Sequence, residues 1–133
     1  MRKAALLIVS LALVVGAIAA GAQAGSSRSD GMYGIKIVNY KVNADRTVTI
    51  NVKIRGFKMA PGSVGKKTNK VGSGHWHIYV NGKYNNAVAN PTMGKTKKLK
   101  KGEYKVYVEL ANNDHSSLNE KTVSKTIPVM VGA

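Results

Sequence analysis

The chain contains no cysteine, three histidines and six acidic residues among its 133 residues. Without cysteine it can form no disulfide bond, thiolate metal site or cysteine nucleophile. With so few Asp and Glu residues, no carboxylate pair is marked out for acid–base catalysis, and no serine nucleophile elbow is visible. We therefore expect a binding or structural protein and not an enzyme.

Basic residues are abundant by contrast: Lys and Arg number 21, and the formal net charge is +15. A field of this sign attracts polyanions, although it can equally serve solubility. The candidate polyanion-binding lysines fall in two runs: Lys66, Lys67, Lys97, Lys98, Lys100 and Lys101. Aromatic residues that could stack on bases are not interleaved with them, so we expect an anionic cell-surface polymer and no nucleic acid. A solvated lysine face is the alternative.

Residues 1–24 are predicted to be a secretory signal peptide. Arg2 and Lys3 precede an apolar run from Ala4 to Ala20, and Ala22-Gln23-Ala24 matches a cleavage site. An uncleaved anchor is the alternative, because the apolar run approaches the length that spans a membrane. The small residues favour cleavage, so we expect a secreted or extracytoplasmic protein with no stable membrane span after cleavage.

Residues 34–133 are predicted to form one β-sandwich domain, preceded by a disordered polar lead at 25–33. A length of about a hundred residues suits a single modest core. Apolar and polar residues alternate in segments typical of strands: 35–42, 47–55, 75–80, 83–89, 95–99, 104–110 and 121–131. About seven short strands without a helical period predict an all-β, immunoglobulin-like antiparallel sandwich.

Several residues mark the connections and the core of this sandwich. Asn81-Gly82 predicts a two-residue hairpin turn, and Pro128 predicts an edge position or a bulge for the last strand. The segment from Gly56 to Ser73 carries glycines and lysines without alternation and is predicted to be a long exposed loop. Trp76, in the middle of the chain, is expected in the core.

The histidines suggest a metal site. In an extended strand His75 and His77 share one face, opposite Trp76. If this strand neighbours the one ending at Leu110, His115 in the turn that follows Leu110 can approach both His75 and His77. Asp114 or Glu109 would then lie nearby. Imidazoles with a carboxylate or water suit Cu(II) or Zn(II). We predict a site for copper, or zinc, formed by His75, His77, His115 and Asp114. Ordinary hydrogen bonding within the sheet and turn is the structural alternative.

Four short motifs occur in a characteristic order between Phe57 and Val131: Pro61-Gly62, Gly72-Ser73-Gly74-His75-Trp76-His77, Lys101-Gly102-Glu103-Tyr104 and Asn113-Asp114-His115, followed by Thr122-Val123-Ser124. This order resembles a family of small exported bacterial domains of unknown function. The resemblance implies an immunoglobulin-like sandwich outside the cytoplasm and implies no activity. The family has a further histidine where this chain has Trp76. A looser likeness to exported copper-binding sandwich proteins of the copper-resistance type rests on fold class alone.

Three functions follow from these patterns. The first is an exported metal-binding carrier or buffer. The second is a basic, non-enzymatic adhesion module that binds anionic envelope polymers or a protein partner through its lysines. The third is a structural subunit that assembles through an exposed strand edge.

Overall fold

The computed structural model describes residues 32–119 and 121–132, and within these ranges the chain is all-β. The expected signal peptide, and the lead up to residue 31, lie outside the described residues. The strands are β1 (Gly34–Val42), β2 (Val48–Arg55), β3 (Lys58–Met59), β4 (Ser73–Val80), β5 (Lys83–Val88), β6 (Met93–Lys95), β7 (Gly102–Ala111) and β8 (Ile127–Val131). A short 3-10 turn, η5 (Pro61–Ser63), is also present. None of the described segments is a helix long and apolar enough to cross a membrane.

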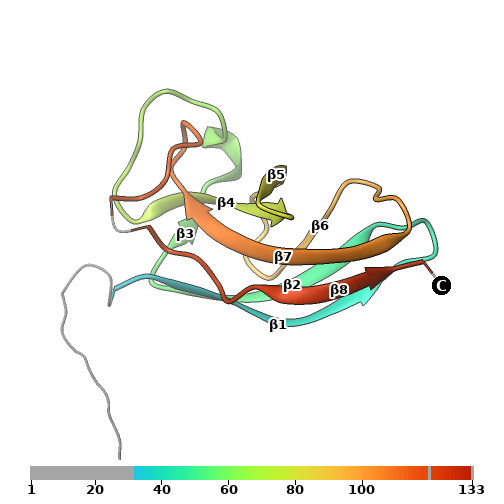
Figure 1. Cartoon of the computed structure of the whole chain (residues 1–133). Helices are drawn as coiled ribbons and strands as arrows, with labels where there is room; N and C mark the ends of the chain where they lie inside the picture. Colours follow the sequence, from blue (N-terminus) through green and yellow to red (C-terminus); the bar gives the residue numbers. More distant parts are fainter. Residues whose placement is uncertain (1–31, 120, 133) are drawn as a thin grey trace, which may run out of the picture. The chain divides into compact units, whose positions relative to one another are not determined.

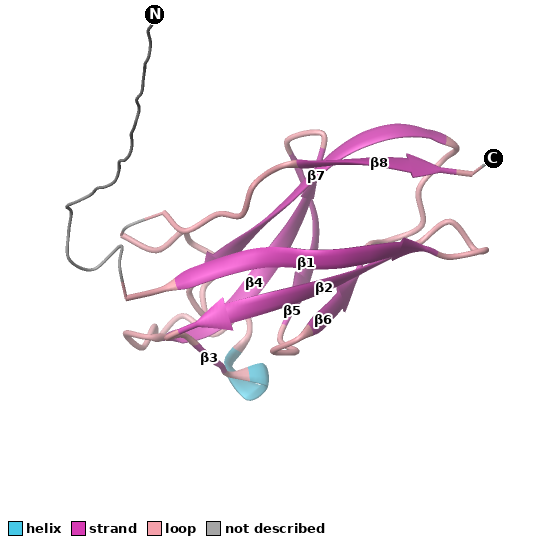
Figure 2. Ribbon diagram, turned by 90° about the horizontal axis from the view of Figure 1, so that it is seen from below, coloured by secondary structure: helices cyan, strands magenta, loops and turns pink. Residues whose placement is uncertain are grey.

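The strands form two sheets that enclose a common core (Figures 1 and 2). One sheet has the order β1-β2-β6. The other has the order β3-β4-β7-β8, and β5 also pairs with β4. Neighbours are antiparallel with one exception among the described pairs, the short parallel contact between β3 and β4. The predicted all-β sandwich is confirmed at this level.

The core is built by strand alternation, as the sequence predicted. In β2, Val48, Ile50 and Val52 are buried between more exposed residues. Trp76 is fully buried, and its Nε1 donates to the carbonyl oxygen of Asn90 at 2.7 Å. From β4 and β7 the remaining buried apolar residues are Ile78, Val80, Val106, Val108, Leu110 and Ala111. Apolar burial on this scale is the main source of stability in a domain without disulfides.

The hairpin between β4 and β5 forms where Asn81-Gly82 predicted it. The two residues have φ of 51° and 79°, which is the geometry that favours Asn-Gly in a two-residue turn. Pro128 lies in β8, at the edge of its sheet, also as predicted. An edge position tolerates proline because one side of the strand has no neighbour to receive an N–H.

Two predicted strands differ from the structure by more than two residues at one end, whereas the bounds of the others agree within two residues. The segment 95–99 is not a strand beyond Lys95: the Thr96 hydroxyl accepts a hydrogen bond from Val48 N at 2.9 Å, so a side chain replaces the regular ladder there. The last strand begins at Ile127, later than predicted. Upstream of it Glu109 and Val123 form only an isolated antiparallel bridge, beside which the Ser124 hydroxyl accepts from Val108 N at 3.0 Å.

The loop predicted between Gly56 and Ser73 is largely exposed but more ordered than expected. It contains β3 and η5 and lies beside the loop that follows β7, at the upper left of Figure 1. Gly65 N donates to the Asn113 carbonyl at 2.7 Å, and Asn113 Nδ2 donates to the Thr68 carbonyl at 3.0 Å. These bonds join two loops that are distant in sequence.

Candidate metal centre

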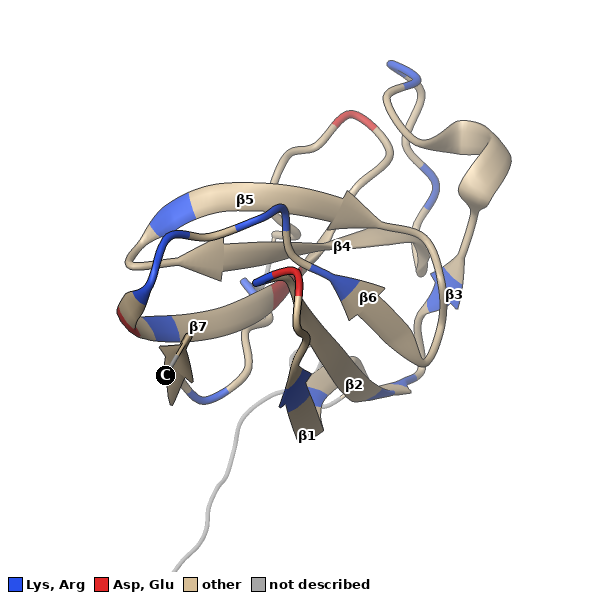
Figure 3. Cartoon of the chain, turned by 90° about the vertical axis from the view of Figure 1, so that its right-hand side faces the viewer, with Lys and Arg blue, Asp and Glu red and all other residues tan. Residues whose placement is uncertain are grey.

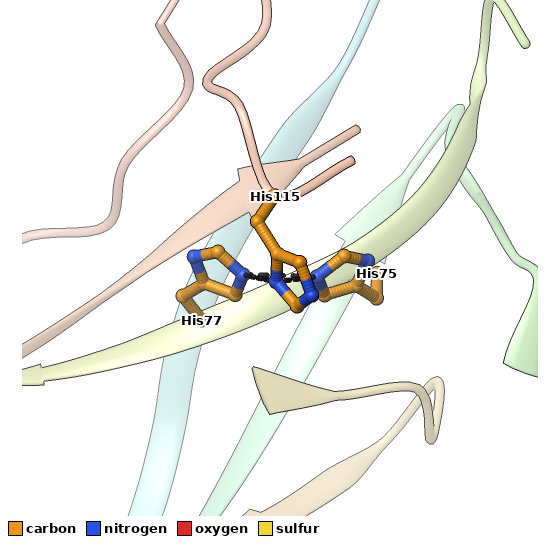
Figure 4. A group of neighbouring side chains, drawn as sticks. All are labelled: His75, His77 and His115. Atoms are coloured by element: carbon orange, nitrogen blue, oxygen red, sulfur yellow. Dashed lines mark hydrogen bonds between the residues drawn. The ribbon is translucent and has the colours of Figure 1, made fainter. Parts of the chain in front are cut away.

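Three imidazole nitrogens meet on the outer side of β4. His75 Nε2 lies 2.9 Å from His77 Nε2 and 3.2 Å from His115 Nδ1. His77 Nε2 lies 3.1 Å from His115 Nδ1, which closes the triangle. Figure 4 shows the two rings from β4 facing each other, with the His115 ring between them. The three histidines thus form one group that could hold a metal ion, as the sequence predicted.

Strand β4 sets the position of two of these rings. His75 and His77 alternate with Trp76, so the core ring and the two imidazoles point to opposite sides of the sheet. The imidazoles are nevertheless buried, with exposed fractions of 0% and 3%. The Tyr84 ring of β5 lies edge-on to His77 at 4.9 Å between centroids and helps to cover it. Side chains on the outer side of β4 are therefore buried as well, outside the main hydrophobic core.

The loop after β7 supplies the third ring. His115 N donates to the Asn112 carbonyl and Asn112 N donates to the Ser116 carbonyl, both at 2.9 Å, so the loop is a tight turn. His115 has φ of 72°, in the left-handed region that non-glycine residues seldom adopt. Such backbone strain persists where surrounding structure enforces it and is concentrated at functional sites. Here it aims the imidazole at β4.

Protons alone cannot satisfy this triangle. In a neutral imidazole each nitrogen is either an N–H donor or a lone-pair acceptor. With three mutually close nitrogens of only two kinds, at least one of the three contacts must join two donors or two acceptors. A cation at the triangle removes this conflict, because it accepts all three lone pairs together.

The size of the triangle fits a transition-metal ion. Zinc and copper bind imidazole nitrogen at about 2.0–2.1 Å. With the observed separations of 2.9, 3.1 and 3.2 Å, all three nitrogens would be able to bind one ion at that distance. Such an ion would take three ligands from the protein, and its remaining coordination positions would be filled by water or an external ligand.

Burial keeps the two strand imidazoles neutral. Desolvation lowers the pKa of His75 from 6.5 to about 4, and the nearby His77 and His115 rings add to this effect. Desolvation and then His115 lower the pKa of His77 to about 4 as well. A metal binds the neutral ring, so both side chains are in their ligating form at neutral pH.

The predicted fourth ligand, Asp114, does not belong to the group formed by the three histidines. It is exposed, and its Oδ1 accepts hydrogen bonds from the backbone N and the hydroxyl of Ser116. Asn112 Nδ2 likewise donates to Ser116 and to Ser117. In the described part of the chain these side chains shape the loop, and none of their hydrogen bonds reaches an imidazole. Nδ1 of His75 is buried without a hydrogen-bond partner in the same part, so the polar contacts of this ring are those of its Nε2 with His77 and His115.

The sequence did not identify Tyr84 as a neighbour of the site. The hairpin register pairs Tyr79 with Tyr84, and Tyr79 lies two residues after His77 on the same side of β4. Because Asn81-Gly82 fixes this register, the turn signal could have placed Tyr84 beside the histidines. Glu109, which the sequence placed near the site, faces His77 across β4 and β7 in the observed register.

The two groups of candidate polyanion-binding lysines lie at different ends of β4. Lys66 and Lys67 lie in the loop that leads into Ser73, at the start of β4. The others lie in the link from β6 to β7, beyond the opposite end, where Val80 pairs with Val106. The structure therefore does not bring the six lysines into one surface.

Comparison with protein-family models, curated proteins and solved structures finds no match for this chain. The structure itself defines an all-β protein of two sheets with a three-histidine cluster on one outer face, in which His75 and His77 are buried and His115 is exposed.

Proposed function

We propose that this protein binds a transition-metal ion through His75, His77 and His115. The observation that carries the proposal is the closed triangle of ring nitrogens, whose contacts of 2.9 to 3.2 Å cannot all be donor–acceptor pairs. Three histidines make up a small share of the chain, yet they meet from two distant segments. Accidental packing of this kind would leave like partners in contact with nothing gained.

Copper is the metal that this donor set favours, with zinc second. Divalent ions of the first transition row bind a given nitrogen site most strongly as Cu(II). We infer a carrier or buffer role, because His115 is exposed and one side of the ion would remain open for exchange. The signal-like residues 1–24 and the family resemblance support the proposal that this role is carried out outside the cytoplasm by an immunoglobulin-like domain. We propose no catalytic role, because the sequence marks out no serine nucleophile elbow and no carboxylate pair.

Calorimetric titration of the purified protein with Cu(II) and with Zn(II) at pH 7 tests the proposal. We expect one ion per chain, and quenching of Trp76 fluorescence by Cu(II), because Trp76 lies between two ligands on β4. His115→Asn removes the imidazole, and the new Asn side chain also tolerates the positive φ of this position. This change should weaken binding by at least about 100-fold, more than the loss of a group that only hydrogen-bonds to a metal ligand.

Asp114→Asn is the matched control from the same loop. It retains an oxygen that can accept from Ser116 and changes the charge of a residue outside the histidine group. Binding within about 3-fold of the native protein is expected, well below the loss of a ligand. Absence of binding by the native protein, or equal affinity of the native protein and His115→Asn, would refute the metal site.

A second candidate function rests on the link between β6 and β7. Lys97, Lys98, Lys100 and Lys101 are exposed, whereas Thr96 and Leu99 attach the link to the sandwich. Thr96 N and Leu99 N donate to the Val48 and Arg46 carbonyls at 3.0 and 2.9 Å. Figure 3 shows this basic link beside the basic ends of β5 and β7. A fixed backbone with outward lysines suits adhesion to an anionic envelope polymer.

Retention on a phosphate-bearing resin as a function of salt tests this second function. Screening predicts a steep fall in retention with ionic strength. Replacing Lys97 and Lys98 with Gln should shift elution to lower salt, whereas the same change at Lys66 and Lys67 should shift it less. Equal shifts for the two pairs would show that net charge, and not the link, determines retention.

A further inference from the structure

Glu109 is a buried carboxylate beside the histidine triangle. Its exposed fraction is 2%, and it pairs in register with His77 across β4 and β7. Directly paired residues on one side of a sheet have Cβ atoms about 4.5–5.5 Å apart. The Ser117 hydroxyl donates to Glu109 Oε2 at 2.7 Å, and the Tyr79 hydroxyl also hydrogen-bonds to this carboxylate.

The charge of this carboxylate is not balanced by a basic side chain. Within residues 32–119 and 121–132, Glu109 forms no ion pair with Lys or Arg, although the chain is rich in both. Burying an unpaired charge is costly, and proteins ordinarily compensate it with an opposite charge or a metal. The Ser117 and Tyr79 hydroxyls provide hydrogen bonds without a positive charge.

Glu109 lies beside the candidate metal centre on the outer side of β4 and β7. Ser117, which holds the carboxylate, lies two residues after His115, and His77 is its cross-strand partner. The carboxylate is not a member of the ligand group itself. It thus lies next to the ion position without forming part of the nitrogen triangle.

We propose that Glu109 is the charge-compensating positioning residue that makes this centre select divalent over monovalent ions; this rests on the proposed metal function. Three neutral imidazoles alone bring no charge and could hold a monovalent ion as well. Adding one fixed negative charge stabilises a doubly charged ion twice as strongly as a singly charged ion at the same position. The preferred ligands are therefore Cu(II) and Zn(II), and copper should be held in its oxidised state.

Glu109→Gln tests the proposal, because Gln retains an oxygen acceptor for Ser117 and loses the charge. Affinities for Zn(II) and for Ag(I), a redox-inert monovalent probe, are measured on the native protein and the variant. We expect the variant to lose about 10-fold more affinity for Zn(II) than for Ag(I). Ser117→Ala, which removes the tether and keeps the charge, should change both affinities by similar factors.

Glu109→Asp provides a second variant that keeps the negative charge, and it should preserve the preference for Zn(II). If Glu109→Gln is folded and its ratio of Zn(II) affinity to Ag(I) affinity equals that of the native protein, the proposal is overturned. Glu109 would then have a purely structural role. Failure of the native protein to bind either ion would instead refute the metal function itself, so the two failures are distinguishable.

Discussion

His115 Nδ1 lies 3.1 Å from His77 Nε2, although 38 residues separate these histidines along the chain. The approach depends on the antiparallel register of β4 and β7, in which His75 faces Ala111, the last residue of β7. His115 follows four residues later, in a loop that the bridge between Ala111 and Ser117 closes. A one-residue slip of β4 would turn both strand histidines to the core. The register that buries the core residues of β4 is therefore also the register that assembles the histidine site.

Bound metal should stabilise the fold. An ion that binds only the native state at about 100 times its dissociation constant raises the free energy of unfolding by about 2.7 kcal/mol. We expect this gain in urea unfolding of the native protein with Zn(II), and its loss after treatment with a chelator. His115→Asn, measured under the same conditions, should gain much less. A chelator-insensitive native protein would contradict the expectation.

The metal-free protein should lose stability in mild acid because of His75 and His77. Their pKa values are about 4 in the folded protein, against an ordinary 6.5, so the unfolded chain binds more protons between these values. The free energy of unfolding is therefore full above pH 6.5 and falls as the pH drops toward 4. At pH 5 the loss is up to about 2 kcal/mol for each ring.

Urea unfolding at pH 7 and pH 5 measures this loss. Asp45 and Asp114 do not interfere, because hydrogen bonds from Thr47 and Ser116 hold their carboxyl pKa values below the ordinary 3.8. Their contribution is present above 3.8 and disappears only at lower pH. His77→Gln should show less than half of the native loss, because the change removes one ring and also one cause of the lowered pKa of His75. Identical stability at pH 7 and pH 5 would be inconsistent with two neutral buried imidazoles.

Gly74 should tolerate no side chain. A Cβ at this position would overlap the carbonyl oxygen of Ala111 on β7 and come within 3.1 Å of the Phe57 ring. Relief requires β4 and β7 to separate, so we expect Gly74→Ala to destabilise the protein by about 2–3 kcal/mol. Gly62→Ala is the control, because nothing lies within 4 Å of a Cβ there, and its effect should stay within about 0.5 kcal/mol. Equal unfolding midpoints for the two variants would argue against close contact of the strands.

His115 should show a backbone effect separate from metal binding. Its φ of 72° is accessible to Asn and unfavourable for a β-branched residue. In the presence of a chelator we expect His115→Val to be less stable than His115→Asn by about 1–2 kcal/mol in urea unfolding. Indistinguishable stabilities would mean that the loop adopts another conformation in solution.

Local patterns predicted the parts of the fold that local chemistry controls. Alternation placed Trp76 in the core and His75 and His77 on the other side of the sheet, because strand geometry fixes side-chain direction. Asn81-Gly82 fixed one hairpin, because few residues accept positive φ. The position of His115 could be predicted only on the condition that β4 pairs with β7. The sequence of neither strand determines which strand it pairs with.

Other features depend on contacts that no periodicity reveals. The segment 95–99 alternates like a strand, yet the Thr96 hydroxyl takes the place of a ladder partner for Val48. The strand histidines were expected on an outer face, and they are on it, but burial there arises from a loop and from Tyr84. Asp114 was expected as a ligand because it adjoins His115, although its carboxylate binds Ser116. Neighbours in sequence need not share a direction in a tight turn.

The chain has no cysteine, and the histidine triangle offers a reversible substitute for a covalent cross-link. An ion held by His75 and His115 would close a ring across a sequence separation of 40 residues, comparable to the span of many disulfides. Unlike a disulfide, this metal-mediated cross-link would break when the ion is lost, without any change in redox state. The rigidity of the loop after β7 would then report how much free metal surrounds the protein.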